Sequence, residues 1–216
     1  MPTEKFFNLK EGKRQAILEA AGEELLETPY SLLTVSRIIQ KAGISRASFY
    51  YYFRDKEDLF YHMVEEMRSR FLSDMEKALR DSKGDFLEGF KKMLHFALED
   101  GAFRKRCSLY RRLAEDARYR SQTTRKEASF YDKDGLRKFV RSREGLLDEE
   151  RYGGLDEEKS ICLLEMGVLV VIKTMFLCFV GNDGKCLRKT AIRQLEILDR
   201  GARSFQENQE DTRSSA

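Results

Sequence analysis

The sequence predicts an all-α protein in which an N-terminal three-helix domain precedes a larger helical domain. Only two prolines and fourteen glycines occur in 216 residues, which is too little turn punctuation for many short strands. Apolar residues recur at steps of three and four along most of the chain, the spacing that places them on one helix face. With 41% apolar and 36% charged residues and a mean hydropathy of −0.58, the composition is that of a soluble protein with a core.

After a short arm at residues 1–8, the first expected helix opens directly after Asn8 and runs to about residue 28. Asn8 lies three positions before Glu11, which is the spacing of a capping box, and Pro29 ends the helix. The sequence therefore predicts a helix with one apolar face, directly before the segment that contains Gly43.

Two short helices are expected on either side of Gly43. Thr34 would cap the first helix and Ser45 the second, which covers residues 46–52. Asp55 would cap a longer fourth helix with a continuous apolar stripe.

Beyond Gly84 the helical spacing persists with weaker punctuation. The expected helices cover residues 85–99, 102–120, 126–145, 156–180 and 186–206. The polar residues 207–216 are expected to form a disordered tail.

The two short helices around Gly43 have the pattern of a helix-turn-helix. Glycine permits the sharp turn, and aliphatic side chains of the first helix would brace the second. The second helix would then present Arg46 and Ser48 to base edges, with Ser45 at its N-terminal end. Ala47 is small enough to allow close approach to the major groove.

Basic residues and tyrosines near the helix-turn-helix could bind the phosphates of the DNA backbone. The stretch from Arg37 to Lys56 holds five basic residues against Asp55 alone, although the whole chain has a net charge of only +3. Three tyrosines at residues 50–52 supply hydroxyl donors, and Lys56 stands at the positive end of the next helix. This segment therefore has the chemistry for binding phosphates.

The chain resembles the tetracycline-repressor (TetR) family over about residues 10–62. The resemblance is carried by the Thr34 cap, by AGIS at residues 42–45, by FYYYF at residues 49–53 and by DKEDL at residues 55–59. It implies a dimeric DNA-binding regulator, usually a repressor, that a small ligand releases from a palindromic operator.

The resemblance also implies a division of labour along the chain. Residues 9–54 would form the helix-turn-helix DNA-binding domain, and residues 55–206 the helical ligand-binding and dimerisation domain. The N-terminus lacks the apolar core of a signal peptide, so we expect a cytoplasmic protein, and the resemblance implies a bacterial one.

Carried over position by position, the expected DNA contacts come from both short helices and the start of the next one. They are Thr34, Ser36, Arg37, Ser45, Arg46, Ala47, Ser48, Tyr50, Tyr51, Tyr52 and Lys56. Arg46 is the strongest candidate for reading sequence, because a guanidinium can bind guanine through two hydrogen bonds. In the family, Tyr50 and Tyr52 would contact phosphates, and the position of Ser36 sometimes reads a base. Tyr51 is left open between a phosphate contact and an exposed residue without one.

The segment from residue 161 to residue 180 is apolar enough to suggest a membrane span. Glu165 and Lys173 lie inside it, and each charge would cost about 2.5–3.5 kcal/mol at the bilayer centre. We therefore expect a soluble helix and no membrane partner. In the family the last two long helices, here residues 156–180 and 186–206, pair with those of a second copy.

The resemblance further implies a pocket for an unknown small-molecule effector. The candidate lining residues are Met67, Phe71, Phe90, Met93, Leu94, Tyr110, Glu165, Met166 and Lys173. The alternative is ordinary core packing, because packed helices also show stripes of methionine and aromatic residues. The basic stretch from Arg104 to Lys126 is left open between an anionic ligand, DNA and a solvated face.

No sequence pattern points to catalysis or metal binding. The four cysteines form no CxxC pair, and His62 and His95 stand alone. Neither GxxxxGK[ST] nor GxSxG occurs, so we expect a regulator without a cofactor rather than an enzyme. The alternative is a helical protein-interaction module that does not bind DNA.

Overall fold

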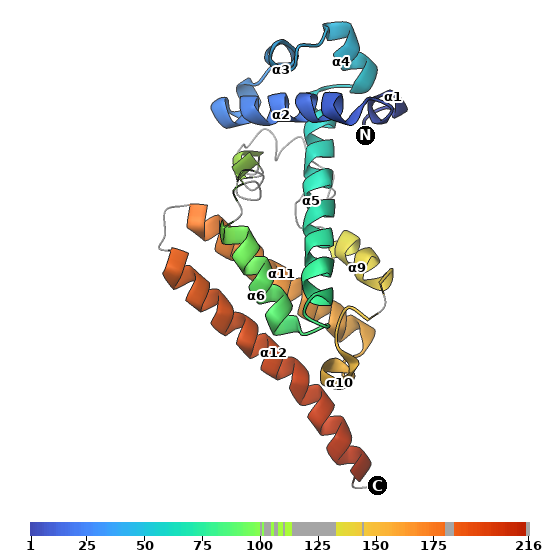
Figure 1. Ribbon diagram of the computed structural model, residues 1–216, viewed down its shortest axis with the longest axis vertical. Helices are drawn as coiled ribbons and strands as arrows, with labels where there is room; N and C mark the ends of the chain where they lie inside the picture. The colour runs from blue at the N-terminus through green and yellow to red at the C-terminus, as the bar shows by residue number, and fades with distance from the viewer. Residues whose placement is uncertain are drawn as a thin grey trace. The chain divides into compact units, whose positions relative to one another are not determined.

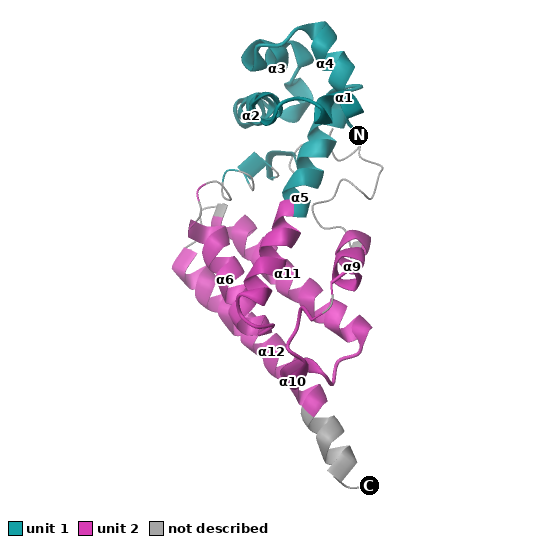
Figure 2. Ribbon diagram, turned by 45° about the vertical axis from the view of Figure 1, so that its right-hand side comes forward, with its two compact units in different colours: residues 1–69, 105–132 teal, residues 70–104, 133–216 magenta. Residues whose placement is uncertain are grey.

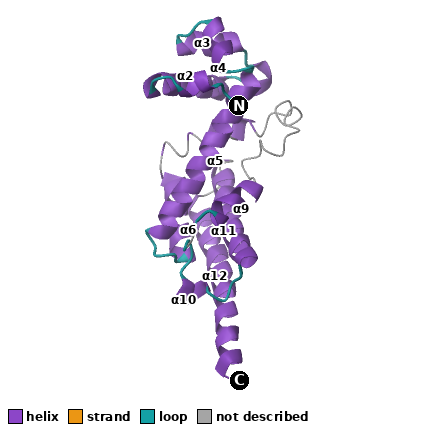
Figure 3. Ribbon diagram, turned by 90° about the vertical axis from the view of Figure 1, so that its right-hand side faces the viewer, coloured by secondary structure: helices purple, strands orange, loops and turns teal. Residues whose placement is uncertain are grey.

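The computed structural model describes residues 1–99, 101, 105, 108–109, 111–113, 133–143, 145–179 and 184–214. Every regular element among these residues is a helix, and they contain no strand (Figure 3). The prediction of an all-α protein is thereby confirmed. Contacts divide the chain into two compact units (Figure 2). Unit 1 comprises residues 1–69 and 105–132, and unit 2 comprises residues 70–104 and 133–216.

Unit 1 contains the helices of the N-terminal region and the beginning of a long helix. Its elements are α1 (Glu4–Phe7), α2 (Glu11–Glu27), the 3₁₀ helix η1 (Tyr30–Leu32), α3 (Val35–Ala42), α4 (Arg46–Tyr52) and the first part of α5 (Lys56–Arg80). Helix α2 packs against α3, and α4 packs against both α3 and α1 (Figure 1). Leu59 and Phe60 of α5 belong to the same core as Phe49 of α4. Because of this shared core, the unit extends beyond residue 54, where the sequence-based domain boundary was placed.

The turns of unit 1 follow the predicted capping chemistry at three positions. Gly43 ends α3 with a φ of 64°, a left-handed conformation that favours glycine. The Ser45 hydroxyl oxygen caps α4 by accepting from the amide three residues later at 3.0 Å. Asp55 accepts in the same way from the Asp58 amide at 2.8 Å, at the start of α5. Thr34 precedes α3 in an extended conformation, but its side chain makes no capping bond.

The predicted capping box at the start of α2 is wrong. Helix α2 begins at Glu11, but Lys10 occupies the capping position without a side-chain bond. Asn8 instead ends α1, the short helix that replaces the expected arm. The physical reason is burial: Phe6 of α1 is only 1% exposed, so this segment folds onto the core instead of leaving Asn8 free to cap α2.

Unit 2 is built around three helices that pack against one another. Its elements are the remainder of α5, α6 (Phe86–Glu99), α9 (Lys133–Arg141), α10 (Glu149–Tyr152), α11 (Glu157–Phe179) and α12 (Gly184–Ser214). Helices α6, α11 and α12 make mutual contacts, and α9 and α10 pack on α11 and α12 respectively (Figure 1).

A close contact between α6 and α11 is made possible by a glycine. Phe90 is fully buried, and a Cβ added at Gly167 would lie 2.6 Å from its ring. The ring therefore fills the space that a side chain at position 167 would need. Phe86 lies against the same ring, with 4.7 Å between the ring centroids.

Buried polar groups tie α6, α10 and α12 together. The Tyr152 hydroxyl donates to an Asp199 carboxylate oxygen and accepts from the Phe86 amide at 3.2 Å. Arg203 lies 3.0 Å from the second Asp199 oxygen. Burial, and then the neighbouring Asp199, raises the pKa of Tyr152, so this phenol stays protonated and keeps its role as a donor.

Several predicted helix bounds differ from those in unit 2. The helix expected at residues 102–120 falls largely outside the described residues, and the one expected at 126–145 is described only as α9. Helix α12 continues to Ser214, although a disordered tail was expected for residues 207–216. Glutamate, glutamine and arginine are good helix formers, and no proline or glycine follows Gly201 to end the helix.

One described helix, Glu157–Cys178 within α11, is long and apolar enough to cross a membrane by length and composition. Core helices of soluble proteins have the same property. Here Leu164 and Val171 are fully buried, and α11 packs against α6 and α12. The arrangement is that of a core helix with one face left open.

Candidate DNA-binding surface

Helix α4 is held at its start and along its inner face. Ser45 caps its first turn, and the Ser45 and Ser48 hydroxyl oxygens lie 2.9 Å apart. Phe49 and Phe53 are both fully buried, with 5.4 Å between their ring centroids. The opposite face of α4 points outward, and Arg46, Ala47 and Tyr50 are exposed on it.

Arg46 links the two helices of the motif. Its guanidinium donates to the Ser36 hydroxyl of α3 at 3.2 Å and to the Tyr50 hydroxyl of α4 at 3.4 Å. The structure thus brings together three residues that the sequence singled out. All three side chains are exposed, so the guanidinium can exchange these neutral partners for a base edge or a phosphate.

Arg37 and Lys41 of α3 have acidic partners on α2. The Arg37 guanidinium pairs with Glu24, whose side chain is 5% exposed, while that of Arg37 is 52% exposed. Lys41 lies 2.9 Å from Glu27, and this hydrogen bond raises the pKa of Lys41. These ion pairs fasten α3 to α2. A role of Arg37 in DNA contact would therefore be shared with a structural one.

The three consecutive tyrosines have different environments. Tyr50 and Tyr51 are 47% and 56% exposed, whereas Tyr52 is 8% exposed. The Tyr52 ring packs against Phe6, with 6.3 Å between the ring centroids. Tyr52 therefore contributes to the core as well as being a candidate phosphate contact.

Lys56 has internal partners that the sequence did not reveal. Its ammonium donates to the backbone carbonyls of Tyr30 and Leu33 at 3.0 and 2.9 Å. It also lies 4.4 Å from the centroid of the buried Tyr30 ring. Lys56 therefore stabilises the connection between α2 and α3, a role that depends on contacts more than twenty residues away in sequence.

Two further residues were missed by sequence reasoning. Glu24 looks like one of several surface acids on α2, yet it is 3% exposed and anchors α3. Thr3 lies in the segment expected to be an arm, yet it bonds to α4. Neither residue carries a sequence signal, because both contacts join segments that are distant along the chain.

The predicted ligand-lining residues lie in several environments. Phe71, Phe90, Met93 and Leu94 are buried in the packed core of unit 2. Met67 and Glu165 are partly exposed, while Met166 and Lys173 are exposed. Tyr110 lies outside the described residues, as does most of the basic stretch from Arg104 to Lys126. The prediction of a pocket formed by these residues stays a prediction.

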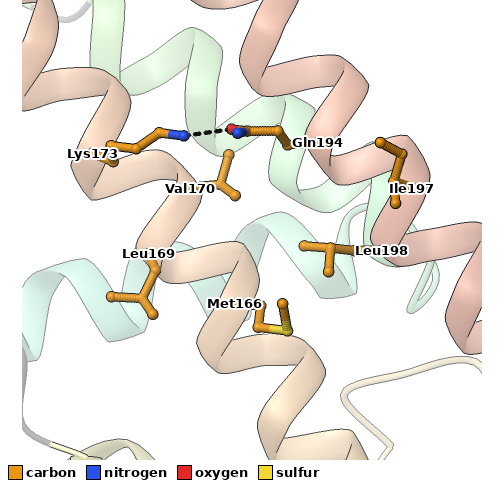
Figure 4. Close-up of a pocket in the computed structure, with 7 residues that line it drawn as sticks. All are labelled: Met166, Leu169, Val170, Lys173, Gln194, Ile197 and Leu198. Carbon is orange, nitrogen blue, oxygen red and sulfur yellow. Dashed lines mark hydrogen bonds between the residues drawn. The ribbon is translucent and has the colours of Figure 1, made fainter.

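A cavity of about 330 Å³ lies between α11 and α12 on the surface of unit 2. It is lined by Met166, Leu169, Val170, Lys173, Gln194, Ile197 and Leu198 (Figure 4). The Lys173 ammonium donates to the Gln194 side chain at 2.7 Å across it. Met166, Leu169 and Ile197 are 49%, 43% and 70% exposed, which leaves an apolar surface open.

These features define a helix-turn-helix protein, with α3 and α4 joined at Gly43 and braced by α2. Residues 17–63 match the family described as bacterial regulatory proteins, tetR family. The resemblance indicated by the sequence is thereby confirmed over the helix-turn-helix region of the chain.

Relatives and solved structures support this assignment. The fatty acid metabolism regulator protein of Bacillus subtilis is 32% identical over 72 residues, which are 33% of this chain and 37% of that protein. The HTH-type transcriptional repressor AcnR of Corynebacterium diphtheriae is 29% identical over 49% of this chain and 60% of that protein. The structure of the fatty acid degradation regulator FadR from Bacillus halodurans superposes with a TM-score of 0.57 at 20% identity, over 87% of this chain and 96% of that chain.

The sequence similarity and the structural similarity cover different shares of the chain. The chain spans between about one third and three fifths of the length of these two curated relatives. The structural similarity extends over most of the chain, and at 20% identity it shows the fold of unit 2 as well as that of unit 1.

Proposed function

We propose that this protein is a dimeric, sequence-specific DNA-binding transcriptional regulator, and specifically a repressor released from a palindromic operator by a small molecule. The observation that carries the proposal is the outward face of α4. There Arg46 is exposed and is held between Ser36 and Tyr50, as a side chain that reads base edges needs to be.

The candidate contacts separate into two groups by chemistry. Arg46, Ala47 and Ser48 at the start of α4 would face the bases, with Ser36 beside them. Hydroxyl and ammonium groups would contact phosphates, which position the protein without reading sequence. The residues proposed for this second group are Thr34, Arg37, Ser45, Tyr50, Tyr51, Tyr52 and Lys56.

The proposed dimer forms through the exposed apolar surface of α11 and α12. Ile197 is an aliphatic residue that is 70% exposed, and Met166 and Leu169 lie exposed on the same cavity. Burying such a surface is favourable, and a second copy presents an identical apolar surface to it. Leu195, also on α12, is fully buried within unit 2 and is therefore not part of this surface.

The proposed effector is a small molecule bound by unit 2. A ligand can release DNA only if it binds one arrangement of the dimer better than the other. The relatives named above are regulators, one of them a transcriptional repressor, and we propose no catalytic role and a cytoplasmic location for this protein.

The experiment that tests this function is the selection of bound duplexes from a random DNA pool at two salt concentrations. A palindromic consensus is expected, because two copies of α4 related by a two-fold axis read two half-sites. Affinity should fall by on the order of 10³ or more between about 50 and 200 mM salt, as phosphate contacts are screened. If no sequence is enriched and no duplex is bound at low salt, the proposal is wrong. The alternative function, a helical protein-interaction module that does not bind DNA, is then favoured.

A further inference from the structure

Helix α4 is too short to be stable by itself. It spans seven residues, and isolated helices shorter than about 12 residues are marginal in water. The last carbonyls of any helix also have no partner within it. The position of α4 therefore depends on groups supplied by other parts of the chain.

Two of these carbonyls are bound by a single residue from the N-terminal segment. The Thr3 backbone amide donates to the Tyr52 carbonyl at 2.9 Å. The Thr3 hydroxyl donates to the Tyr51 carbonyl at 2.8 Å. Both bonds reach α4 across about fifty residues of sequence.

The hydroxyl of Thr3 is used in an unusual way. Thr3 occupies the capping position of α1, where threonine ordinarily accepts from an amide of its own helix. No such capping bond is made, and the hydroxyl is turned towards α4 instead. Phe6 fixes the same segment, because its buried ring lies 4.7 Å from that of Phe53, at the end of α4.

We propose that Thr3 is a positioning residue for DNA recognition, which holds the C-terminal end of α4 so that its outward face keeps its orientation. The inference rests on the proposed DNA binding. Thr3 touches no base in this scheme. It acts through the backbone of Tyr51 and Tyr52, and thereby on the direction in which Arg46 and Tyr50 project.

The test compares Thr3→Val, which removes the hydroxyl and keeps the shape, with Thr3→Ser, which keeps the hydroxyl. Ser142→Ala is the matched control, because the Ser142 hydroxyl donates to the Phe139 carbonyl at the same 2.8 Å, just after the end of α9 in unit 2. Urea unfolding of each variant establishes that it folds.

The first readout is amide hydrogen exchange at residues 50–53 of the free protein. Thr3→Val should speed exchange there by about three- to tenfold, the range expected for loss of one neutral hydrogen bond. Thr3→Ser and Ser142→Ala should exchange like the wild type. Unchanged exchange in Thr3→Val, or no rescue by Thr3→Ser, would overturn the inference.

The second readout is the ratio of affinities for the selected duplex and an unrelated duplex. Thr3→Val should lower this ratio by about three- to tenfold, and Thr3→Ser should restore it. Faster exchange with an unchanged ratio would make Thr3 a purely structural residue and overturn the inference. If the wild type binds no duplex at all, the proposed function itself fails, and the inference that rests on it falls for that separate reason.

Discussion

Arg46 and Lys56 carry the same charge but have different surroundings. Arg46 is exposed and donates to two hydroxyls, whereas the Lys56 ammonium is bonded to two backbone carbonyls inside unit 1. Mutation of single residues should therefore separate the reading of bases by Arg46 from the contact of Lys56 with phosphates.

Arg46→Ala should relax sequence preference at one base pair per half-site and leave most non-specific affinity intact. A guanidinium bound to guanine through two bonds contributes about 1–3 kcal/mol of discrimination. Repeating the duplex selection with the variant measures this. Arg54→Ala is the control, since Arg54 is also exposed but pairs with Asp55 at 2.8 Å outside α4. A preference lost equally in both variants would contradict the assignment of Arg46.

Lys56→Met should weaken binding to all duplexes alike, flatten the salt dependence and lower the free energy of unfolding. The loss of stability should be about 1–2 kcal/mol, because two backbone carbonyls lose a charged donor. Urea unfolding and salt titrations measure the two effects. Lys13→Met, at an exposed position of α2, is the control for stability. Weaker binding with unchanged stability would show that the internal contacts of Lys56 contribute nothing.

The stability of unit 1 should depend on pH through His62. Its ring packs edge-on to Phe6 and Phe7, with centroid distances of 5.4 and 5.5 Å. Burial lowers the pKa of His62 below its ordinary value of 6.5, while Glu66 and Asp58 oppose this shift. As pH falls below 6.5, the unfolded chain takes up the proton before the folded chain does, so the folded state loses stability.

The expected result is a lower urea midpoint at about pH 5.5 than at about pH 7, and a smaller difference in His62→Gln. His95→Gln is the matched control, because His95 is 54% exposed and lies on α6 in unit 2. A pH difference of the same size in His62→Gln would exclude His62 as its source.

At the scale of elements, the sequence was sufficient wherever capping and turn chemistry are local. Gly43 ends α3, Ser45 begins α4 and Asp55 begins α5, as predicted. Each of these residues acts on groups within three or four positions of itself. The capping box at Asn8 failed for the opposite reason. Burial of Phe6 against distant helices decided the local structure there.

The candidate site was likewise predicted only in part. The helix-turn-helix pattern singled out Arg46, the run of tyrosines singled out Tyr50, and the family resemblance added Ser36. Spacing could not reveal that Lys56 binds carbonyls of the η1 region or that Thr3 binds α4. It also could not distinguish a ligand pocket from packing, since core residues such as Phe90 follow the same apolar stripe as pocket residues would.

Gly167→Ala should destabilise the crossing of α6 and α11. The added Cβ would lie 2.6 Å from the Phe90 ring, so one of the helices must shift, at a cost of about 1–3 kcal/mol. Gly12→Ala is the control within a helix, because nothing lies within 4 Å of its added Cβ. Its stability should be unchanged or raised by about 0.5–1 kcal/mol. Equal effects of the two changes in urea unfolding would contradict the proposed close packing.

At the scale of the whole molecule, the proposed dimer forms through the open surface of α11 and α12. Ile197→Glu places a charge on this surface in both copies of the proposed dimer, so its dissociation constant should rise about tenfold or more. Sedimentation at several protein concentrations measures this. Leu32→Glu is the matched control, because Leu32 is 69% exposed but lies in unit 1. Dimers of equal strength in both variants would place the interface elsewhere.

Two copies of α4, joined in the proposed dimer, should read two half-sites on the same face of a duplex. The measurement that tests this compares affinity for the selected palindrome with affinity for the same duplex carrying about five extra base pairs between the half-sites. This half-turn moves one half-site to the opposite face, so affinity should fall to that of a duplex with a single half-site. Equal affinity for the original and the lengthened palindrome would contradict the claim.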